Sequence, residues 1–335
     1  MRRRDRRSAV AALSLVALAA VGLAGCSKPT VTPAPGAPVA YATVGSSAAT
    51  PGDSVLPVAT TTGKLGRPIV VGTLPSAIAL VPGGASLLVA VKAEDDLVEV
   101  STATGKVVTK VGVGLEPDAV AVTPDGSTAF VANFGDDTVT EVALPSLVAG
   151  RTIPVGREPV ALAVTPDGAQ VLVINFGDGT LTPIALPSLT AGAAVPVGPE
   201  PVALATTSSG SEALVADFQT SSLTPVGLPA LTPGAALPVG ANPTGLVIPA
   251  AGTVAWVSAG DGVTPVSLTG APVGAAIPLG VPSQCIASGP VGRAWVCSGN
   301  GALVEVDLAT GRVVRTVTLA GIPSAVVVTR PPASS

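Results

Sequence analysis

Short apolar runs alternate with turn-forming residues along most of this chain. Residues 158–179 show the pattern clearly, with the sequence EPVALAVTPDGAQVLVINFGDG. Two apolar runs, VALAV and QVLVI, are separated by Thr-Pro-Asp-Gly at 165–168 and followed by a second turn at 175–179. Such runs are typical of β-strands, because Pro fixes φ at the second turn position and Gly accepts a positive φ. The pattern therefore predicts an all-β chain.

This unit repeats along the chain about every 42 residues. A proline precedes the first apolar run of each unit, and these prolines are Pro75, Pro117, Pro159, Pro201, Pro243, Pro282 and Pro323. In the third unit we expect four strands, at 160–164, 170–174, 180–185 and 193–197. Four short strands in about 40–45 residues is the size of one blade of a β-propeller.

The two ends of the repeat region complement each other. The last unit holds only one strand, whereas residues 38–72 match strands two to four of a unit. We therefore expect a seven-bladed β-propeller of four-stranded antiparallel blades, closed by one C-terminal strand (323–329) plus three N-terminal strands (38–72). Closure of this kind removes open sheet edges. The alternative is a six-bladed ring in which residues 38–72 form a linker.

The residues before the ring indicate export. Residues 1–25 combine five Arg with an apolar run that ends in small residues, as in a signal peptide. The segment Leu23-Ala24-Gly25-Cys26 resembles the lipobox of bacterial lipoproteins, which implies acylation of the Cys26 thiol. We expect residues 26–37 to tether a propeller at 38–330, with a tail at 331–335, to the outer side of the bacterial cell membrane. An uncleaved signal-anchor helix is the alternative.

Composition removes several classes of site. The chain has no His, which excludes Ser-His-Asp and Cys-His catalysis and the commonest metal ligand. Residues 1–25 hold five of the 17 basic and one of the 21 acidic residues, so their removal changes the net charge from −4 to −8. No basic patch with interleaved aromatic residues is present, so we expect no nucleic-acid partner. We expect a monomer.

Acidic residues collect on one predicted face of the ring. This first face carries the turns between strands two and three and the crossings from strand four to the next blade. The second face carries the other turns, with Asp125 and Asp167 and several cations. We expect the first face to bind a cation, with Ca²⁺ as a candidate, or a basic partner. The candidate ligand-binding residues are Glu116, Glu158, Glu200, Arg157, Asp136 and Asp178. The alternative is that each Asp only stabilises its own turn.

Two further residue pairs stand out. Cys285 and Cys297 lie on adjacent predicted strands, where a disulfide is the natural expectation for an exported protein. Two free buried thiols or a redox pair are the alternatives. Asn133 and Asn175 end the second strands of their units, where an amide side chain can satisfy backbone groups of the turn.

Units such as EPDAVAVTPDGSTAFVANFGDDTVTEVAL resemble the YVTN-type repeats of bacterial β-propellers, over about residues 38–330. The resemblance implies a seven-bladed propeller outside the cytoplasm and says little about activity. Lactonase-type propellers resemble this repeat too, but their sites usually include His. We therefore expect a binding scaffold for an envelope protein or a small ligand, with no catalytic residue assigned. The alternatives are a lactonase-like hydrolase, using carboxylates at the channel mouth with Arg157, and a structural envelope component.

Overall fold

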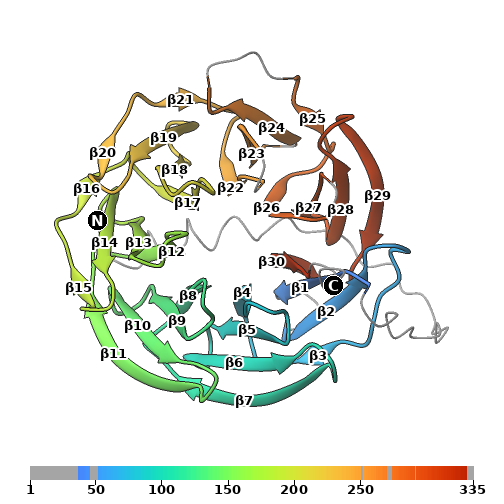
Figure 1. The fold of residues 1–335 in the computed structure, drawn as a ribbon. Helices are drawn as coiled ribbons and strands as arrows, with labels where there is room; N and C mark the ends of the chain where they lie inside the picture. Colours follow the sequence, from blue (N-terminus) through green and yellow to red (C-terminus); the bar gives the residue numbers. More distant parts are fainter. Residues whose placement is uncertain are drawn as a thin grey trace, which may run out of the picture.

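Seven antiparallel sheets stand around a central axis in the computed structural model (Figure 1). The structure describes residues 37–45, 52–249, 252–260, 262–269, 274–290 and 292–329. These residues form strands and turns and contain no helix. The predicted all-β, seven-bladed propeller is confirmed.

The blades are numbered from the one that contains the first strand. Blade 1 consists of β30 (Ile322–Val328), β1 (Val39–Gly45), β2 (Ser54–Ala59) and β3 (Ile69–Val70). Blade 2 consists of β4 (Pro75–Leu80), β5 (Ser86–Val91), β6 (Asp96–Ser101) and β7 (Lys106–Gly112). Blade 3 consists of β8 (Pro117–Val122), β9 (Thr128–Asn133), β10 (Thr138–Ala143) and β11 (Val148–Pro154).

Blades 4 to 7 follow in chain order. Blade 4 consists of β12 (Pro159–Val164), β13 (Gln170–Asn175), β14 (Thr180–Ala185), β15 (Thr190–Ala191) and β16 (Val195–Pro196). Blade 5 consists of β17 (Pro201–Thr206), β18 (Glu212–Asp217), β19 (Ser222–Gly227), β20 (Thr232–Pro233) and β21 (Leu237–Pro238). Blade 6 consists of β22 (Pro243–Val247), β23 (Val254–Ala259), β24 (Gly262–Ser267) and β25 (Ile277–Pro278). Blade 7 consists of β26 (Ser283–Ser288), β27 (Arg293–Ser298), β28 (Ala302–Asp307) and β29 (Arg312–Thr318).

The two ends of the described chain close the ring. Strand β30 takes the inner position of blade 1 and pairs antiparallel with β1, from Ala40 opposite Val328 to Gly45 opposite Ile322 (Figure 1). The Ser324 hydroxyl then donates a 2.8 Å hydrogen bond to the carbonyl of Pro75 in blade 2. The predicted closure is confirmed, and the six-bladed alternative is wrong.

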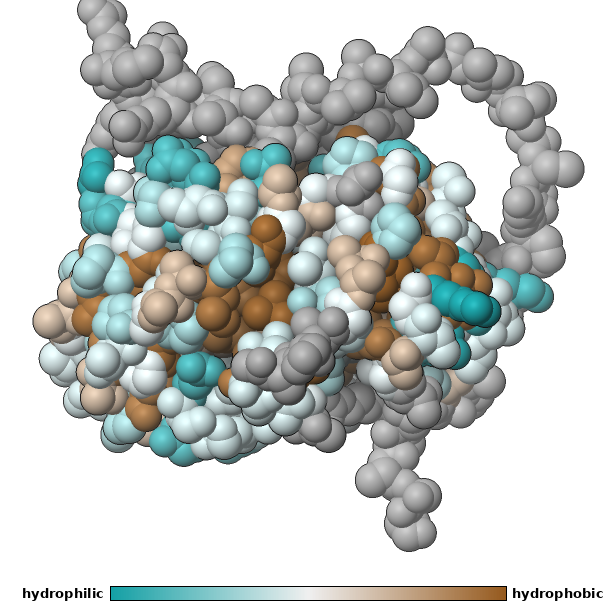
Figure 2. All heavy atoms as spheres, turned by 90° about the horizontal axis from the view of Figure 1, so that it is seen from above, coloured by the Kyte–Doolittle hydropathy of each residue, from teal (hydrophilic) through white to brown (hydrophobic). Residues whose placement is uncertain are grey.

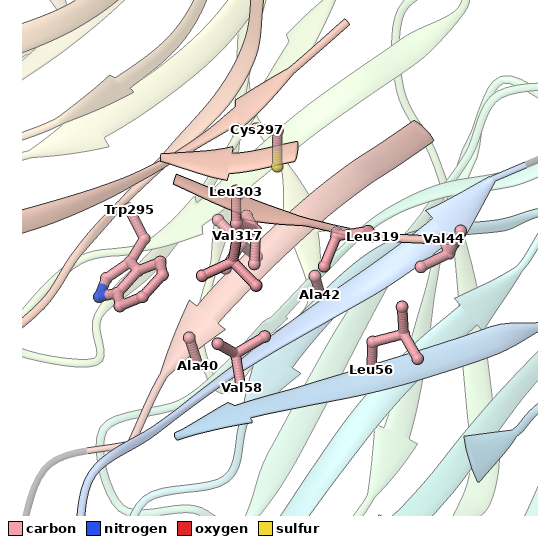
Figure 3. Packing of buried hydrophobic residues seen from close by; sticks show 11 residues of the cluster. Ala40, Ala42, Val44, Leu56, Val58, Trp295, Cys297, Leu303, Val317 and Leu319 are labelled. Carbon is pink, nitrogen blue, oxygen red and sulfur yellow. The ribbon is translucent and has the colours of Figure 1, made fainter. Parts of the chain in front are cut away.

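The core lies between the blades. Second strands such as β5, with the sequence SLLVAV, are fully buried after their first residue because a blade packs on a neighbour at each face. Between blades 7 and 1, Trp295, Leu303 and Val317 pack against Ala42 and Leu56 (Figure 3). Aromatic residues are only 2% of the chain, so interlocking Val, Leu, Ile and Ala form most of this core.

The outer strand of blade 4, which is the third repeat unit, differs from the prediction. A single strand was expected at 193–197, whereas two short pieces, β15 and β16, pair separately with β14. Pro183 lies in the middle of β14 and has no N–H to donate to an outer strand. Its carbonyl instead accepts a 2.8 Å hydrogen bond from Gly192 between the two pieces. Pro225 and Gly234 repeat this arrangement in blade 5, at 2.7 Å.

A disulfide joins Cys285 of β26 to Cys297 of β27 in blade 7. The two residues are direct cross-strand partners, with their Cα atoms 4.8 Å apart. Residues 1–25, Cys26, the tether up to residue 36 and the tail at 331–335 lie outside the described residues. Within the described ranges, no helix has the length and apolar character needed to cross a membrane.

Candidate functional site: the inner rim of the first face

The turns between second and third strands meet the crossings between blades on the first face. Asp95 of blade 2 accepts a 2.8 Å hydrogen bond from the backbone N–H of Glu116, which leads into blade 3. Asp137 of blade 3 accepts the equivalent 2.9 Å bond from Glu158, which leads into blade 4. These two aspartates therefore join blade 2 to blade 3 and blade 3 to blade 4.

Asp136 and Asp178 hold the crossings that lead into their own blades. Asp136 accepts a 2.7 Å hydrogen bond from the N–H of Leu115, and Asp178 accepts one of the same length from Arg157. The Arg157 guanidinium also contacts Asp178 at 2.6 Å, while its Nη2 donates to the carbonyl of Gly177. The backbone bond and then the guanidinium lower the pKa of Asp178, whose charge is matched locally. These contacts favour the turn-stabilising interpretation of both aspartates.

The crossing glutamates lie along one arc of the ring. Glu116, Glu158 and Glu200 directly precede β8, β12 and β17, whose neighbouring inner strands contact one another. All three residues adopt a left-handed backbone, with φ of 51–55°. Leu74 and Asn242 share it at equivalent crossings, so the conformation belongs to the crossing and not to the glutamates. The three half-buried side chains thus follow consecutive blades around the inner rim.

A residue that the sequence analysis missed completes this rim. Asp118, the second residue of β8, forms a 3.1 Å ion pair with Lys92 from blade 2. The Lys92 ammonium also lies 4.7 Å from the ring centroid of Phe134, within the range of a cation–π contact. Burial raises the pKa of Asp118, Lys92 lowers it, and the nearby charge of Glu116 raises it further. Solvent still reaches both partners, since 26% of the Lys92 side chain and 20% of the Asp118 side chain are exposed.

The position of Asp118 holds a hydroxyl in several other blades. Ser76, Thr244 and Ser324 each donate a hydrogen bond of 2.6–3.0 Å to a backbone carbonyl of the following blade. Asp118 replaces that contact by an ion pair with the preceding blade. A signal for this residue was present in the sequence, because Asp118 is the only charged residue in the seven inner strands.

The two asparagines have internal partners. The Asn133 amide donates to the hydroxyls of Thr138 and Thr140 at 3.0 and 2.9 Å, and its carbonyl oxygen accepts from Gly114 N–H. Asn175 makes the same pair of donations to hydroxyls on β14. Both residues are fully buried. Asn133 therefore stabilises its turn and the adjoining crossing, whereas the Asn175 amide hydrogen-bonds only to β14, because its carbonyl oxygen has no partner among the described residues.

The described residues contain no group of three or more His, Cys, Asp or Glu side chains placed to hold a metal ion. The carboxylates of the first face are spread over several blades, and at least six of them are engaged by backbone N–H groups. The negative charges of this face are therefore distributed around the ring and not gathered at one point.

The second face carries a different feature between blades 3 and 4. A cavity of about 350 Å³ is lined by the Thr-Pro-Asp-Gly turns of both blades and by Glu141. Asp125 and Asp167 line this cavity and accept hydrogen bonds from groups of their own turns. The Thr123 hydroxyl donates to Asp125 at 2.5 Å, and the Thr165 hydroxyl donates to Asp167 at 2.6 Å. These bonds lower the pKa of both aspartates, as expected for residues that stabilise a turn.

Comparisons with solved structures identify the fold. A functionally unknown protein from Desulfotomaculum acetoxidans superposes with a TM-score of 0.77 at 17% identity, covering 88% of this chain and 99% of its own. A putative 6-phosphogluconolactonase from Bacteroides fragilis superposes with a TM-score of 0.74 at 14% identity, covering 89% of this chain and 100% of its own. Kuenenia stuttgartiensis hydrazine synthase superposes with a TM-score of 0.66 at 18% identity, covering 80% of this chain and 90% of its own. No family model and no curated protein matches this chain. The protein is a seven-bladed β-propeller, similar in fold to 6-phosphogluconolactonase-like proteins.

Proposed function

We propose that this protein is a lipid-anchored β-propeller of the YVTN-repeat type that acts outside the cytoplasmic membrane as a binding scaffold. Its partner is a cationic segment of an envelope protein or a cationic small ligand. It binds at the inner rim of the first face, defined by Glu116, Glu158, Glu200 and the Asp118–Lys92 pair. Acylated Cys26 holds the ring at the membrane.

The environment of Asp118 is the observation that supports this proposal. Its carboxylate is held in a crowded position where burial disfavours the charged form, and one lysine offsets that cost. A second positive charge arriving from solvent would stabilise the ionised form further. Glu116 lies close enough to raise the pKa of Asp118, so the same cation would relieve the repulsion between these two carboxylates.

Crosslinking in the native envelope, followed by identification of the co-purifying molecules, tests the proposal. The wild-type chain should capture a cationic partner, and the variant E116Q/E158Q/E200Q should capture much less of it. Capture should also fall as ionic strength rises, because exposed charges are screened. Undiminished capture by the triple variant would remove the inner rim as the site.

A matched control removes the same number of charges elsewhere. Glu99, Glu141 and Glu212 lie within β6, β10 and β18, away from the crossings. The variant E99Q/E141Q/E212Q should therefore retain the partner. Loss of capture in both triple variants would indicate a dependence on net charge alone.

A lactonase-like hydrolase is the second candidate. It is favoured by the structural likeness to proteins named as 6-phosphogluconolactonases and by a carboxyl group of raised pKa beside a lysine at the rim. Turnover of a panel of lactones by the wild type, lost in D118N, would support this activity. A purely structural envelope component is the third candidate, for which neither capture nor turnover is expected.

A further inference from the structure

The cations of the outer strands are confined to one side of the ring. The segments between third strands and crossings carry seven of the 17 Lys and Arg residues and no Asp or Glu. All seven belong to blades 7, 1, 2 and 3, and they are Lys64, Arg67, Lys106, Lys110, Arg151, Arg312 and Arg315. The equivalent segments of blades 4, 5 and 6, at 186–198, 228–240 and 268–280, contain no charge.

Exposed valines accompany these cations in blades 2 and 7. Strand β7 begins Lys106-Val107-Val108, and β29 begins Arg312-Val313-Val314. A β-bulge at the same place in both strands leaves Val108 and Val314 without a cross-strand partner. These two valines are 58% and 40% exposed. The bulge therefore presents an apolar side chain beside a cation in each blade.

The same region of the second face continues through blade 1. Lys64 and the exposed Leu65 lie in the turn between β2 and β3. Gly63 in that turn lies against the side chain of Arg315 from blade 7, and Gly105, next to Lys106, lies against Ile69 of β3. We name this surface the basic arc, with Lys64, Lys106 and Arg312 as its cations and Leu65, Val107, Val108, Val313 and Val314 as its apolar residues.

The first residues that the structure describes lie next to the basic arc. The carbonyl of Pro38 accepts a 2.8 Å hydrogen bond from the hydroxyl of Thr60, at the start of the turn that carries Lys64. Only eleven residues, 27–37, separate that point from Cys26, and extended chain at about 3.1 Å per residue spans about 30–35 Å. A lipid on Cys26 would therefore keep the basic arc close to the bilayer surface.

The opposite side of the ring lacks the cations of the basic arc. The edge at the top of Figure 1, over blades 5 and 6, is mostly apolar or weakly polar with scattered hydrophilic residues (Figure 2). The first face carries the crossing glutamates and the aspartates of the turns. An anionic surface would attract the basic arc and repel the first face.

We propose that the basic arc docks on the anionic phospholipid headgroups of the membrane. The cations contact phosphate groups, the exposed valines enter the interface, and the first face points away from the bilayer. This orientation rests on the proposed lipid anchor and leaves the inner rim open to a partner. Each Lys or Arg close to such a surface strengthens binding by about fivefold.

Vesicle co-sedimentation tests the docking without the lipid. The chain from residue 26 onward contains the whole closed ring, and C26S removes the acylation site. This chain should bind phosphatidylglycerol vesicles and not phosphatidylcholine vesicles, and raising the salt concentration should weaken binding. Equal binding to both compositions, or none to either, would overturn the proposal.

Strand β7 offers a matched pair of variants. Lys106 lies at the second-face end of the strand, whereas Lys110 lies four residues on and pairs with Asp96 at 2.7 Å. K106Q should weaken binding about fivefold and K110Q much less, while K64Q/K106Q/R312Q should weaken it about a hundredfold. Equal losses in K106Q and K110Q would contradict the assignment to the basic arc. A doubled solution mass, reversed by V108S/V314S, would assign the arc to a second copy of the chain instead.

Labelling of cells with radioactive palmitate tests the anchor separately. Label on the wild type and not on C26S supports acylation. If the wild type is labelled but the unacylated chain does not bind anionic vesicles, the docking alone is overturned. Absence of label with intact vesicle binding would overturn the anchor and leave the docking surface in place.

Discussion

Lys92 of blade 2 and Asp118 of blade 3 form an ion pair that joins two blades at the inner rim of the propeller, with 3.1 Å between Nζ and Oδ1. Lys92 comes from a turn and Asp118 from an inner strand, at a sequence separation of 26. The pair places the only charge of the inner strands where solvent can reach it.

This pair predicts an unusual pH dependence. Burial raises the pKa of Asp118 above 3.8, so the folded state binds its proton more readily than the unfolded state. Ionisation of Asp118 therefore costs stability as pH rises, and the cost disappears at low pH. The free energy of unfolding of D118N minus that of the wild type should decrease as the pH falls from about 7 to 4, measured by urea denaturation. A difference that grows on acidification would contradict the raised pKa.

D178N is the control of opposite sign. The pKa of Asp178 is lowered by the backbone N–H and then the guanidinium of Arg157, so its charge stabilises the folded state above the unfolded pKa. That contribution is lost as the pH falls through the lowered pKa. D178N should therefore be less stable than the wild type at neutral pH, and the two should converge in acid.

Trp295 packs in the interface between blades 7 and 1, beside the strand pair that closes the ring. This residue is fully buried between blades 7 and 1, and its indole N–H has no hydrogen-bond partner among the described residues. W295A should lower the free energy of unfolding by about 3–5 kcal/mol, because it leaves a large cavity. W295F should cost less than half as much, since it keeps apolar volume and removes an unpaired donor. Chemical denaturation of both variants measures this ratio, and equal losses would contradict it.

Asp217 predicts a stabilising substitution. Asn133 and Asn175 each donate to two hydroxyls at the equivalent position, whereas the Oδ2 atom of fully buried Asp217 has no partner in the described structure. D217N retains the 2.9 Å bond from Thr220 N–H and supplies a donor to the hydroxyls of β19. The free energy of unfolding should rise by about 1–3 kcal/mol. The reverse swap, N175D, should lower it, and a loss of stability in D217N would contradict the argument.

The disulfide of blade 7 should contribute to stability. It closes a short loop with a sequence separation of 12, between two strands that contact the interface with blade 1. C285A/C297A should lower the free energy of unfolding by about 2–3 kcal/mol, measured by denaturation without reductant. Reduction of the wild type should produce a loss of similar size, and an unchanged midpoint in both cases would contradict this contribution.

The fold could be predicted from the sequence because its determinants are local and repeated. A proline at a fixed spacing marks each inner strand, and the three strands at 38–72 match the single strand after Pro323. The divided outer strand of blade 4 could not be foreseen from its own residues. It depends on Pro183 in the neighbouring strand, and therefore on register.

The site was less predictable because side-chain partners are not periodic. Sorting charges by turn predicted that Glu116, Glu158 and Glu200 lie at one rim. In the structure these residues precede β8, β12 and β17, of which β8 contacts β12 and β12 contacts β17. The same sorting overlooked Asp118, because it considered turns and crossings and not inner strands. It also could not show that Asp136 and Asp178 bind backbone N–H groups, since those contacts span 21 residues.

Because β1 pairs with β30, blade 1 has all four of its strands only when the C-terminal strand is present. A chain that stops before Ile322 retains blade 1 as three strands, with the inner edge of β1 unpaired. A free edge of this kind is a template for a strand from another molecule. During synthesis from the N-terminus, β1 stays unpaired on its inner side until β30 has been made, so truncated products should aggregate more readily than the full-length chain.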